Sequence, residues 1–229
     1  AWMATAGYYL PLELLPWPRQ RMAIAFLPGL EGYIWSFPRG DHASVGICGP
    51  LGAPPTAALR QRLEHWLDQR GIAWRGAPFY SHLLPAPAAG GLRGASFEGT
   101  APAPWARVGD AAHLVDPITG EGLYYALRSG ELLAQAWARP GGAGASYSER
   151  LRRELVPELE AAAAIAQRFY RGRFLGDTVL ERMSLFGQRS ARFRQLLCDL
   201  FSGSQGYLGL RRRLYRQLLP TLWQLAAGS

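Results

Sequence analysis

Residues 105–130 constrain the fold of this chain more than any other part of the sequence. They begin with a short apolar segment, Trp105–Val108, that predicts a strand. Gly109 permits a tight turn after it, and Asp110 supplies a carboxylate just beyond the strand end. A loop with proline and glycine follows and leads into a predicted helix over residues 120–138. The sequence therefore predicts a strand, a turn, a shaped loop and a helix, in that order.

This unit has the features of a ligand site. Ligands in open α/β sheets bind beyond the carboxyl ends of the strands, where Asp110 can accept hydrogen bonds from a sugar-like hydroxyl. Pro117, Gly120 and Gly122 shape a loop whose backbone can approach a ligand closely. The first turn of the helix offers N–H groups and partial positive charge, which favour negative charge on a ligand. Taken residue by residue, a glycine-rich turn with a capping aspartate is the simpler interpretation.

As one ordered run, residues 107–130 resemble the second FAD fingerprint of the flavoprotein superfamily that includes aromatic hydroxylases and geranylgeranyl reductases. The resemblance implies that Asp110 binds the ribityl chain and that the loop and helix start lie beside the isoalloxazine ring. The helix end would then stabilise the negative charge of a reduced flavin. The cofactor-binding residues implied are Gly109, Asp110, Pro117, Thr119, Gly120, Glu121, Gly122 and Leu123. The resemblance assigns no catalytic residue, and Glu121 is open to either a catalytic or a helix-dipole role.

Three motifs resemble the geranylgeranyl reductase branch in particular. Residues 119–126, followed by Ser129 and Gly130, replace the asparagine-rich helix start that is usual in hydroxylases. Residues 32–40, with 45–47 after them, resemble a strand motif of that branch's substrate sheet, and 203–208 resemble its tail more weakly. His113 stands where the reductases often have a small residue and hydroxylases often have histidine. His113 is open to a loop hydrogen-bonding role or a flavin-side contact.

The strand motif carries three aromatic residues, Tyr33, Trp35 and Phe37, that alternate with Ile34 and Ser36. They are expected to share one face of a strand, because successive side chains of a strand point to opposite faces. One interpretation is an aromatic wall of a substrate pocket for an isoprenoid chain. The other is an aromatic face of the core. The sequence leaves both open.

The predicted fold class is α+β, with three regions. Residues 1–104 are expected to form an antiparallel substrate-binding sheet, with a meander in residues 1–50. Residues 105–140 would supply the final strand and helix of a Rossmann-like FAD-binding domain. Residues 141–229 are expected to be a helical tail. The family places its Gly-x-Gly-x-x-Gly fingerprint earlier, and none follows a strand here, so we expect the chain to be part of a longer sequence that starts before Ala1.

Several helices have definite sequence signals. A helix over 56–70 is expected to be capped by Thr56 and ended by Gly71, and Ser146 with Glu149 predicts a capping box. Further helices are expected over 190–201 and 208–225. The helix at 120–138 is expected to bury one stripe: Leu123, Ala126, Leu127, Gly130, Leu133 and Ala134.

The composition limits the kinds of partner that we expect the chain to bind. The net charge is +8 and every basic residue is arginine, which we interpret as a solvated surface rather than a nucleic-acid site. For residues 211–213, contact with anionic lipid is the alternative to a solvated helix face. The two cysteines fit no metal motif and no disulfide framework, so we expect free thiols, no metal site and a cytoplasmic location, with peripheral membrane contact as a further expectation. Cys48 is expected to be a buried apolar residue.

The resemblance implies an FAD-dependent oxidoreductase that takes electrons from NAD(P)H or another donor and reduces an isoprenoid double bond. An FAD-dependent monooxygenase and a non-catalytic remnant that binds lipid are the alternatives. In either enzyme, the region covered here is expected to be inactive by itself.

Overall fold

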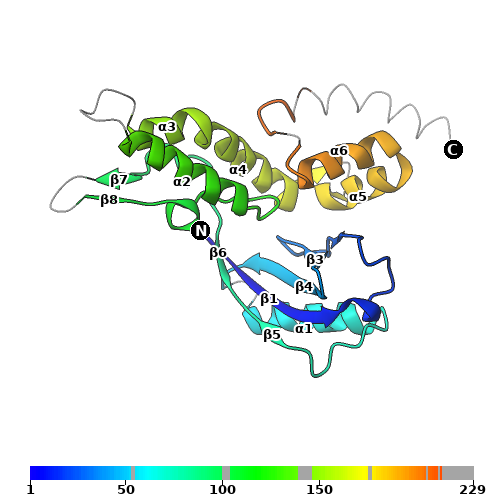
Figure 1. Cartoon of the computed structure of the whole chain (residues 1–229). Coiled ribbons are helices and arrows are strands. Elements are labelled where there is room, and N and C mark those ends of the chain that lie inside the picture. The colour runs from blue at the N-terminus through cyan, green and yellow to red at the C-terminus, as the bar shows by residue number, and fades with distance from the viewer. Residues whose placement is uncertain are drawn as a thin grey trace. The chain divides into compact units, whose positions relative to one another are not determined.

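The computed structural model describes residues 1–52, 55–99, 104–138, 146–174, 177–204, 206–210 and 212. The chain forms two compact units, Ala1–Pro85 and Ala86–Ser229 (Figure 1). The first unit combines an antiparallel sheet with one α-helix, and the described part of the second is mainly helical. This mixture confirms the predicted α+β class.

The sheet of the first unit has six antiparallel strands in the order β2-β3-β4-β1-β5, with β6 also paired to β1. Short apolar runs between glycine and proline turns form these strands, as expected from their sequence. Their bounds are β1 (Trp2–Pro11), β2 (Ala23–Ala25), β3 (Ile34–Pro38), β4 (His42–Pro50), β5 (Phe79–Tyr80) and β6 (Leu83–Pro85).

The meander predicted for residues 1–50 is correct only for β2, β3 and β4. The first strand does not pair with its neighbour in sequence: β1 pairs with β4, from Met3 opposite Pro50 to Pro11 opposite His42. Both strands are long, so together they satisfy most of each other's backbone hydrogen bonds, which the short β2 could not. Local apolar patterns predict a strand but not its partner.

The two faces of this sheet have different roles. Helix α1 (Thr56–Asp68) packs against one face of the sheet (Figure 1). On β1, Ala4, Ala6, Tyr8 and Leu10 are buried in the core that the sheet shares with this helix. Tyr9 lies on the opposite face, because side chains alternate along a strand.

The predicted helix over 56–70 is present as α1, two residues shorter. The predicted apolar stripe is buried: Leu59, Leu63, Trp66 and Leu67. Gly71 has φ +63° just after the helix, as its role in ending it requires. The predicted cap is wrong: Thr56 is the first helical residue, Pro55 holds the N-cap position, and no side chain caps the helix.

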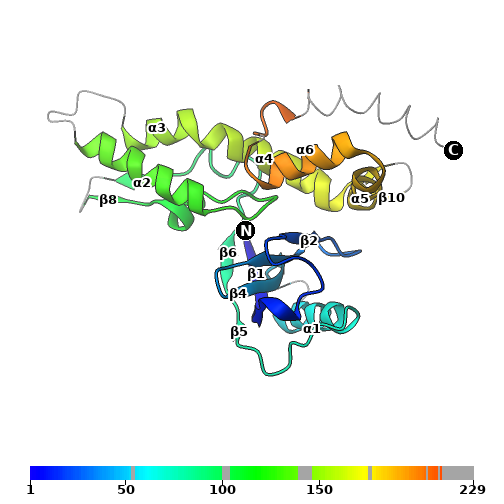
Figure 2. The same cartoon turned by 45° about the vertical axis from the view of Figure 1, so that its right-hand side comes forward.

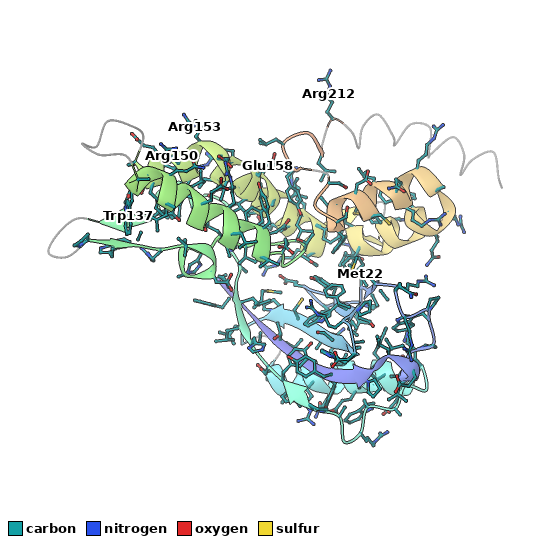
Figure 3. The ribbon with its side chains drawn as sticks, in the orientation of Figure 1. Met22, Trp137, Arg150, Arg153, Glu158 and Arg212 are labelled. Atoms are coloured by element: carbon teal, nitrogen blue, oxygen red, sulfur yellow. The ribbon has the colours of Figure 1, made fainter. Side chains whose placement is uncertain are left out.

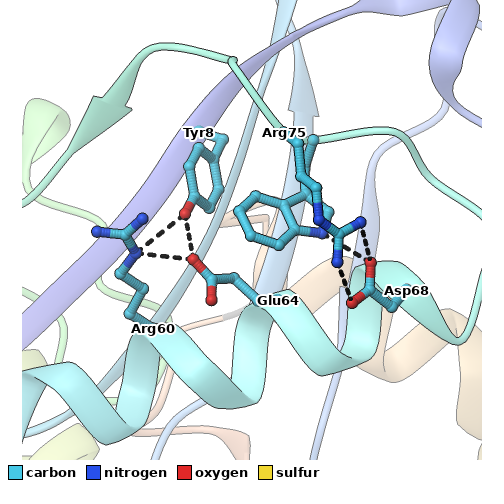
Figure 4. Close-up of polar contacts among 6 residues, drawn as sticks. Tyr8, Arg60, Glu64, Asp68 and Arg75 are labelled. Atoms are coloured by element: carbon cyan, nitrogen blue, oxygen red, sulfur yellow. Dashed lines mark hydrogen bonds and ion pairs between the residues drawn. The ribbon is translucent and has the colours of Figure 1, made fainter.

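Polar contacts fasten α1 to the sheet (Figure 4). The Tyr8 hydroxyl donates to Glu64 Oε1 at 2.5 Å, and Arg60 Nε donates to both the Tyr8 oxygen (3.0 Å) and Glu64 (2.7 Å). Burial and the hydrogen bond to Glu64 raise the pKa of Tyr8 to about 12. Arg75 donates two hydrogen bonds to Asp68 near the end of the helix.

The second unit packs its helices in sequence order, α2 on α3, α3 on α4, α4 on α5 and α5 on α6 (Figure 2). They are α2 (Leu123–Trp137), α3 (Tyr147–Glu154), α4 (Val156–Arg171), α5 (Val179–Arg189) and α6 (Ala191–Phe201). The remaining elements are β7 (Glu98–Gly99), β8 (Trp105–Ala106), the 3-10 turn η2 (Gly109–Ala112), β9 (Arg173–Phe174) and β10 (Asp177–Thr178). Strand β8 pairs antiparallel with β7, and the described residues contain no parallel sheet, so the Rossmann-like assignment of 105–140 stays a prediction.

The stripe predicted for α2 is wrong. The helix buries Tyr125, Ser129 and Leu132 instead, whereas Leu123 and Leu127 are 71% and 69% exposed. Apolar residues occur almost all round this helix, so their spacing in the sequence does not determine which face is buried. Packing against α3 and the turn η2 makes the choice.

The predicted capping box is present at the start of α3: Ser146 Oγ accepts from the Glu149 N–H, and the Glu149 carboxylate accepts from the Ser146 N–H. The helical run after Ser146 is broken between α3 and α4 at Leu155, and Pro157 lies in the first turn of α4. The helix expected over 190–201 is present as α6, and Ser190 caps it. Most of the helix predicted over 208–225, and Arg211 and Arg213, lie outside the described residues.

Candidate functional site

The tight turn expected at Gly109 is present and packs directly on α2. Gly109 has φ +51°, and a Cβ there would lie 2.9 Å from the Cβ of Ala126, so a larger residue does not fit. The Gly109 N–H donates to Ser129 Oγ at 3.0 Å, and the buried Ser129 hydroxyl donates to the Ala126 carbonyl at 3.0 Å. Strand β8 ends at Ala106, two residues before the predicted end, and the backbone at Val108 remains extended.

The turn brings Asp110 to the start of α2. Asp110 is exposed, and its Oδ1 lies 3.2 Å from the position that a Cβ on Gly122 would occupy. Gly122 is the N-cap residue of the helix. The Asp110 carboxylate accepts no hydrogen bond from any residue that the structure describes. Asp110 and Gly122, two predicted site residues that are 12 positions apart in the sequence, therefore lie next to each other. The Asp110 carboxylate remains available there as a hydrogen-bond acceptor.

Asp116 organises the loop between them. Its Oδ1 accepts hydrogen bonds from the N–H groups of Ile118 (2.8 Å) and Thr119 (3.1 Å). Its backbone carbonyl accepts from Gly120, which has φ +73°, and its N–H donates to the Glu121 carbonyl. The loop is thus held by its own hydrogen bonds. We did not predict this role from sequence, although aspartate two residues before a bonded N–H is a recognised turn signal.

Two tyrosines from distant segments hold the same loop. The Tyr207 hydroxyl donates to Asp116 Oδ2 at 2.6 Å, with both side chains buried, and the Tyr170 hydroxyl donates to the Ile118 carbonyl at 2.7 Å. Burial, together with the Asp116 carboxylate, raises the pKa of Tyr207 above its usual range, so the hydroxyl remains a donor. No local pattern in the sequence predicts either contact.

The tail around Tyr207 is fixed in turn by Glu158 of α4 (Figure 3). Glu158 Oε2 accepts hydrogen bonds from the N–H groups of Tyr207 (2.6 Å) and Leu208 (3.3 Å). A Cβ on Gly206 would lie 3.0 Å from Glu158 Oε1, so glycine permits the close approach. These contacts give the weak tail motif a structural role: it secures the loop at 116–122.

The helix start differs from the expectation of unpaired N–H groups. The N–H of Tyr124 donates to Glu121 Oε1 at 2.9 Å, so the glutamate caps α2 and adds negative charge at its positive end. This geometry favours the helix-dipole role of Glu121 and leaves the catalytic one untested. Thr119 Oγ1 accepts from the Glu121 N–H at 3.3 Å. Pro117 is half-buried in the loop, and Leu123 is exposed.

His113 closes the 3-10 turn with φ +57°, an uncommon conformation for a residue other than glycine. Its N–H donates to the Asp110 carbonyl at 2.9 Å, and the side chain is half-buried. The two roles considered for the histidine both remain predictions.

In the first unit, Tyr33, Trp35 and Phe37 form an aromatic row on the sheet face away from α1. Their rings are neighbours, with centroids 6.1 Å apart for the first pair and 6.3 Å for the second, which is stacked. Ile34, between them, belongs to the core under α1, whereas Trp35 and Phe37 are only half-buried. The predicted shared face is therefore present, and the row is separate from the main core.

Two glycines on this face make room for rings. A Cβ on Gly46 would lie 2.4 Å from the Trp35 ring, and one on Gly7 would lie 2.4 Å from the Tyr80 ring. Ser44 joins the rings: its Oγ accepts from Trp35 Nε1 at 3.1 Å and lies 2.6 Å from the Tyr80 hydroxyl. Glycine at position 46 of the strand motif is thus explained by the tryptophan at position 35.

Both cysteines are free, as predicted. Cys48 is buried, and burial raises the pKa of its thiol to about 11, so it is unreactive at neutral pH. A Cβ on Gly32 would lie 2.1 Å from the Cys48 carbonyl oxygen, which explains the first glycine of the strand motif. In the parts of the chain that the structure describes, no group of histidine, cysteine or acidic residues could hold a metal ion, and no helix is long and apolar enough to cross a membrane.

Comparison with known proteins identifies relatives of the chain. It is 33% identical over 149 residues to a menaquinone reductase of Mycolicibacterium smegmatis, covering 61% of this chain and 35% of that protein. It is 34% identical over 136 residues to a digeranylgeranylglycerophospholipid reductase of Methanocella arvoryzae, covering 56% of this chain and 31% of the relative. The chain is related to the geranylgeranyl reductases. The resemblance drawn from its motifs is thereby confirmed.

The fold is also similar to that of a solved structure. A geranylgeranyl bacteriochlorophyll reductase-like protein of Thermoplasma acidophilum superposes with a TM-score of 0.61 at 18% identity, over 80% of this chain and 46% of that one. No protein-family profile matches the chain. The chain spans about a third of the length of the two reductases to which it is related in sequence.

Proposed function

We propose that this chain is part of an FAD-dependent oxidoreductase that reduces a double bond of an isoprenoid-type substrate, with NAD(P)H or another donor as the source of electrons. The observation that carries the proposal is the Asp110 carboxylate, exposed and unbonded beside the glycine start of α2. The names of the relatives, a menaquinone reductase and a digeranylgeranylglycerophospholipid reductase, support a reductase with a prenylated substrate.

The residues present fit a flavin. The Asp110 carboxylate is free to accept hydrogen bonds from ribityl hydroxyls, and Gly120 and Gly122 carry no side chain that would block an approach to the loop backbone. Bound FAD would supply the hydride chemistry. The chain would hold the ring, through the loop 117–122 and the first turn of α2, and Asp116 would keep that loop in shape.

The aromatic row would contact the substrate. Trp35 and Phe37 are half-buried, their rings are stacked, and both lie outside the main core. An apolar chain would need a binding surface of this kind. A prenylated substrate would be met at a membrane surface, so peripheral membrane contact is part of the proposal, with the net charge of +8 favouring anionic lipid.

The test uses the full-length protein that contains this chain. Asp110→Asn should weaken FAD binding about tenfold or more, because a hydrogen bond to a charged group contributes about 1.5–3 kcal/mol. Asp199→Asn, on α6, is the matched control and should leave the FAD dissociation constant unchanged. Fluorescence titration gives both values.

Turnover with a prenylated substrate then tests the reaction. A product with two added hydrogens, formed without oxygen, is expected. An oxygen-dependent hydroxylated product would contradict the proposal and favour a monooxygenase. A full-length protein that binds liposomes but no FAD would instead favour a non-catalytic remnant.

A further inference from the structure

Asp116 places a buried carboxylate at the start of the loop that is proposed to hold the flavin ring. The residue is 5% exposed and forms no ion pair with any residue that the structure describes. A buried charge without a countercharge is unfavourable unless hydrogen-bond donors stabilise it. Three donors do so here, two backbone N–H groups at Oδ1 and one phenol at Oδ2.

The donor at Oδ2 differs from the other two. The N–H groups at Oδ1 belong to Ile118 and Thr119 of the loop itself, whereas Tyr207 lies 91 positions away in the tail. Its hydroxyl is held at 2.6 Å from Oδ2, and the residue is 5% exposed. A hydrogen bond donated to a carboxylate draws off part of its negative charge. Tyr207 therefore limits how much of the charge of Asp116 acts on its surroundings.

The charge of Asp116 acts on the first turn of α2. Tyr125 is buried in that turn, and burial, followed by the negative charges of Asp116 and Glu158, raises the pKa of its hydroxyl. A Coulomb interaction falls only with the inverse of distance and is larger where water is excluded. A ring beside the loop 117–122 and this helix turn would experience the same negative potential.

These carboxylates oppose the effect expected of the helix end. The positive end of α2 would by itself stabilise negative charge on a reduced ring. Asp116 lies in the loop before it, and the Glu121 carboxylate bonds to its first turn. Neither is paired with an arginine in the part of the chain that the structure describes. Negative charge beside a flavin makes the gain of electrons less favourable and lowers its midpoint potential.

We propose that Asp116 and Tyr207 together set the midpoint potential of the bound flavin. The Asp116 carboxylate lowers this potential, and the hydrogen bond from Tyr207 limits the decrease. The inference rests on the proposed function, because it requires the ring to lie beside this loop. A lower potential makes the reduced cofactor a stronger reductant, as the reduction of an isolated double bond requires. It also requires an electron donor of correspondingly low potential.

The test is the midpoint potential of FAD bound to the full-length protein, measured by spectroscopic titration against a reference dye. Asp116→Asn should favour the reduced form about tenfold or more, which is a rise of about 30 mV for a two-electron couple. The asparagine oxygen can still accept from Ile118 and Thr119, so the loop should keep its shape. Tyr207→Phe should shift the potential the opposite way, because the carboxylate then loses a donor.

Two controls separate this effect from a loss of structure. Tyr170→Phe removes a phenol that holds the same loop through the Ile118 carbonyl, at 2.7 Å, and not through the carboxylate. It should leave the potential unchanged. Asp199→Asn removes one negative charge from α6 and should also leave it unchanged. A merely structural role of Asp116 and Tyr207 would loosen the loop in both variants and would not shift the potential in opposite directions.

Shifts of the same sign in Asp116→Asn and Tyr207→Phe, or a potential unchanged in Asp116→Asn, would overturn the proposal. If Tyr207→Phe does not fold, the comparison of Asp116→Asn with Asp199→Asn decides. A wild-type full-length protein that binds no FAD would contradict the proposed function and this inference with it. Bound FAD whose potential does not respond to Asp116 would overturn this inference alone.

Discussion

At the scale of single residues, Gly46 and Gly7 leave the space in which two aromatic rings lie across the first unit's sheet. The ring of Trp35 crosses β4 at Gly46, and its Nε1 reaches Ser44. The position of the aromatic row therefore depends on glycines, which have no side chain. The same holds in the second unit, where Gly109 lets its turn approach α2.

Gly46→Ala tests this dependence. The new methyl would lie 2.4 Å from the Trp35 ring, so the ring or the strand must shift, and we expect a loss of about 1–3 kcal/mol in the free energy of unfolding. Gly40→Ala is the control, because nothing lies within 4 Å of a Cβ there. Urea denaturation followed by tryptophan fluorescence measures both. Equal stability of the two variants would show that the ring is not held against Gly46.

At the scale of elements, α2 is apolar almost all round yet buries only one side. Arg128 helps to fix this rotation through ion pairs with Glu131 and with Glu154 of α3. Half of the stripe predicted from sequence is exposed, namely Leu123, Leu127 and Ala134, and the other half is only partly buried. The orientation of the helix is therefore a result of its neighbours and not of its own period.

Because α2 buries only one face, we expect substitutions on its two faces to lower the free energy of unfolding by different amounts. Leu132→Ala should lower the free energy of unfolding by about 2–5 kcal/mol, because Leu132 is 2% exposed. Leu127→Ala, the same change at a residue that is 69% exposed, should cost under about 1 kcal/mol. Thermal denaturation of both variants distinguishes the faces. A larger loss for Leu127→Ala would favour the stripe predicted from sequence.

The loop 116–122 offers a second test at this scale. Tyr207→Phe removes the hydroxyl that bonds Asp116 Oδ2 and leaves a buried carboxylate oxygen unsatisfied. We expect a loss of about 1–3 kcal/mol and faster hydrogen exchange at the N–H groups of Ile118 and Thr119. Tyr124→Phe is the control, since that side chain is exposed. Unchanged exchange in Tyr207→Phe would mean that the tail does not secure the loop.

At the scale of the whole molecule, the chain forms two compact units and spans about a third of the length of its reductase relatives. The Asp110 turn belongs to one unit and the aromatic row to the other. No Gly-x-Gly-x-x-Gly follows a strand in this sequence, so it carries no recognisable site for the pyrophosphate of FAD.

This absence predicts that residues 1–229 alone hold FAD weakly or not at all. The visible spectrum of the purified chain after incubation with FAD and gel filtration provides the measurement. A protein without flavin absorbance is expected, with the full-length protein as the control. A stoichiometric yellow complex would show that the contacts around Asp110 suffice for binding.

The sequence by itself determined the features that depend on near neighbours. The glycine turn at 109, the capping box of Ser146 and Glu149, the buried stripe of α1 and the shared face of the aromatic row are all present as predicted. Each follows from backbone conformation or from residues a few positions apart. The Thr56 cap is the exception, because a proline one residue earlier takes the N-cap position.

Only the tertiary structure decided which distant segments meet. The partner of β1, the buried face of α2 and the hydrogen bond between Tyr207 and Asp116, 91 positions apart, have no local signal. Many strands could pair with β1 and several faces of α2 are apolar enough to bury. The packing of the whole unit makes the choice. A buried polar group is stable only where the fold also places its hydrogen-bond partner, from elsewhere in the chain, beside it.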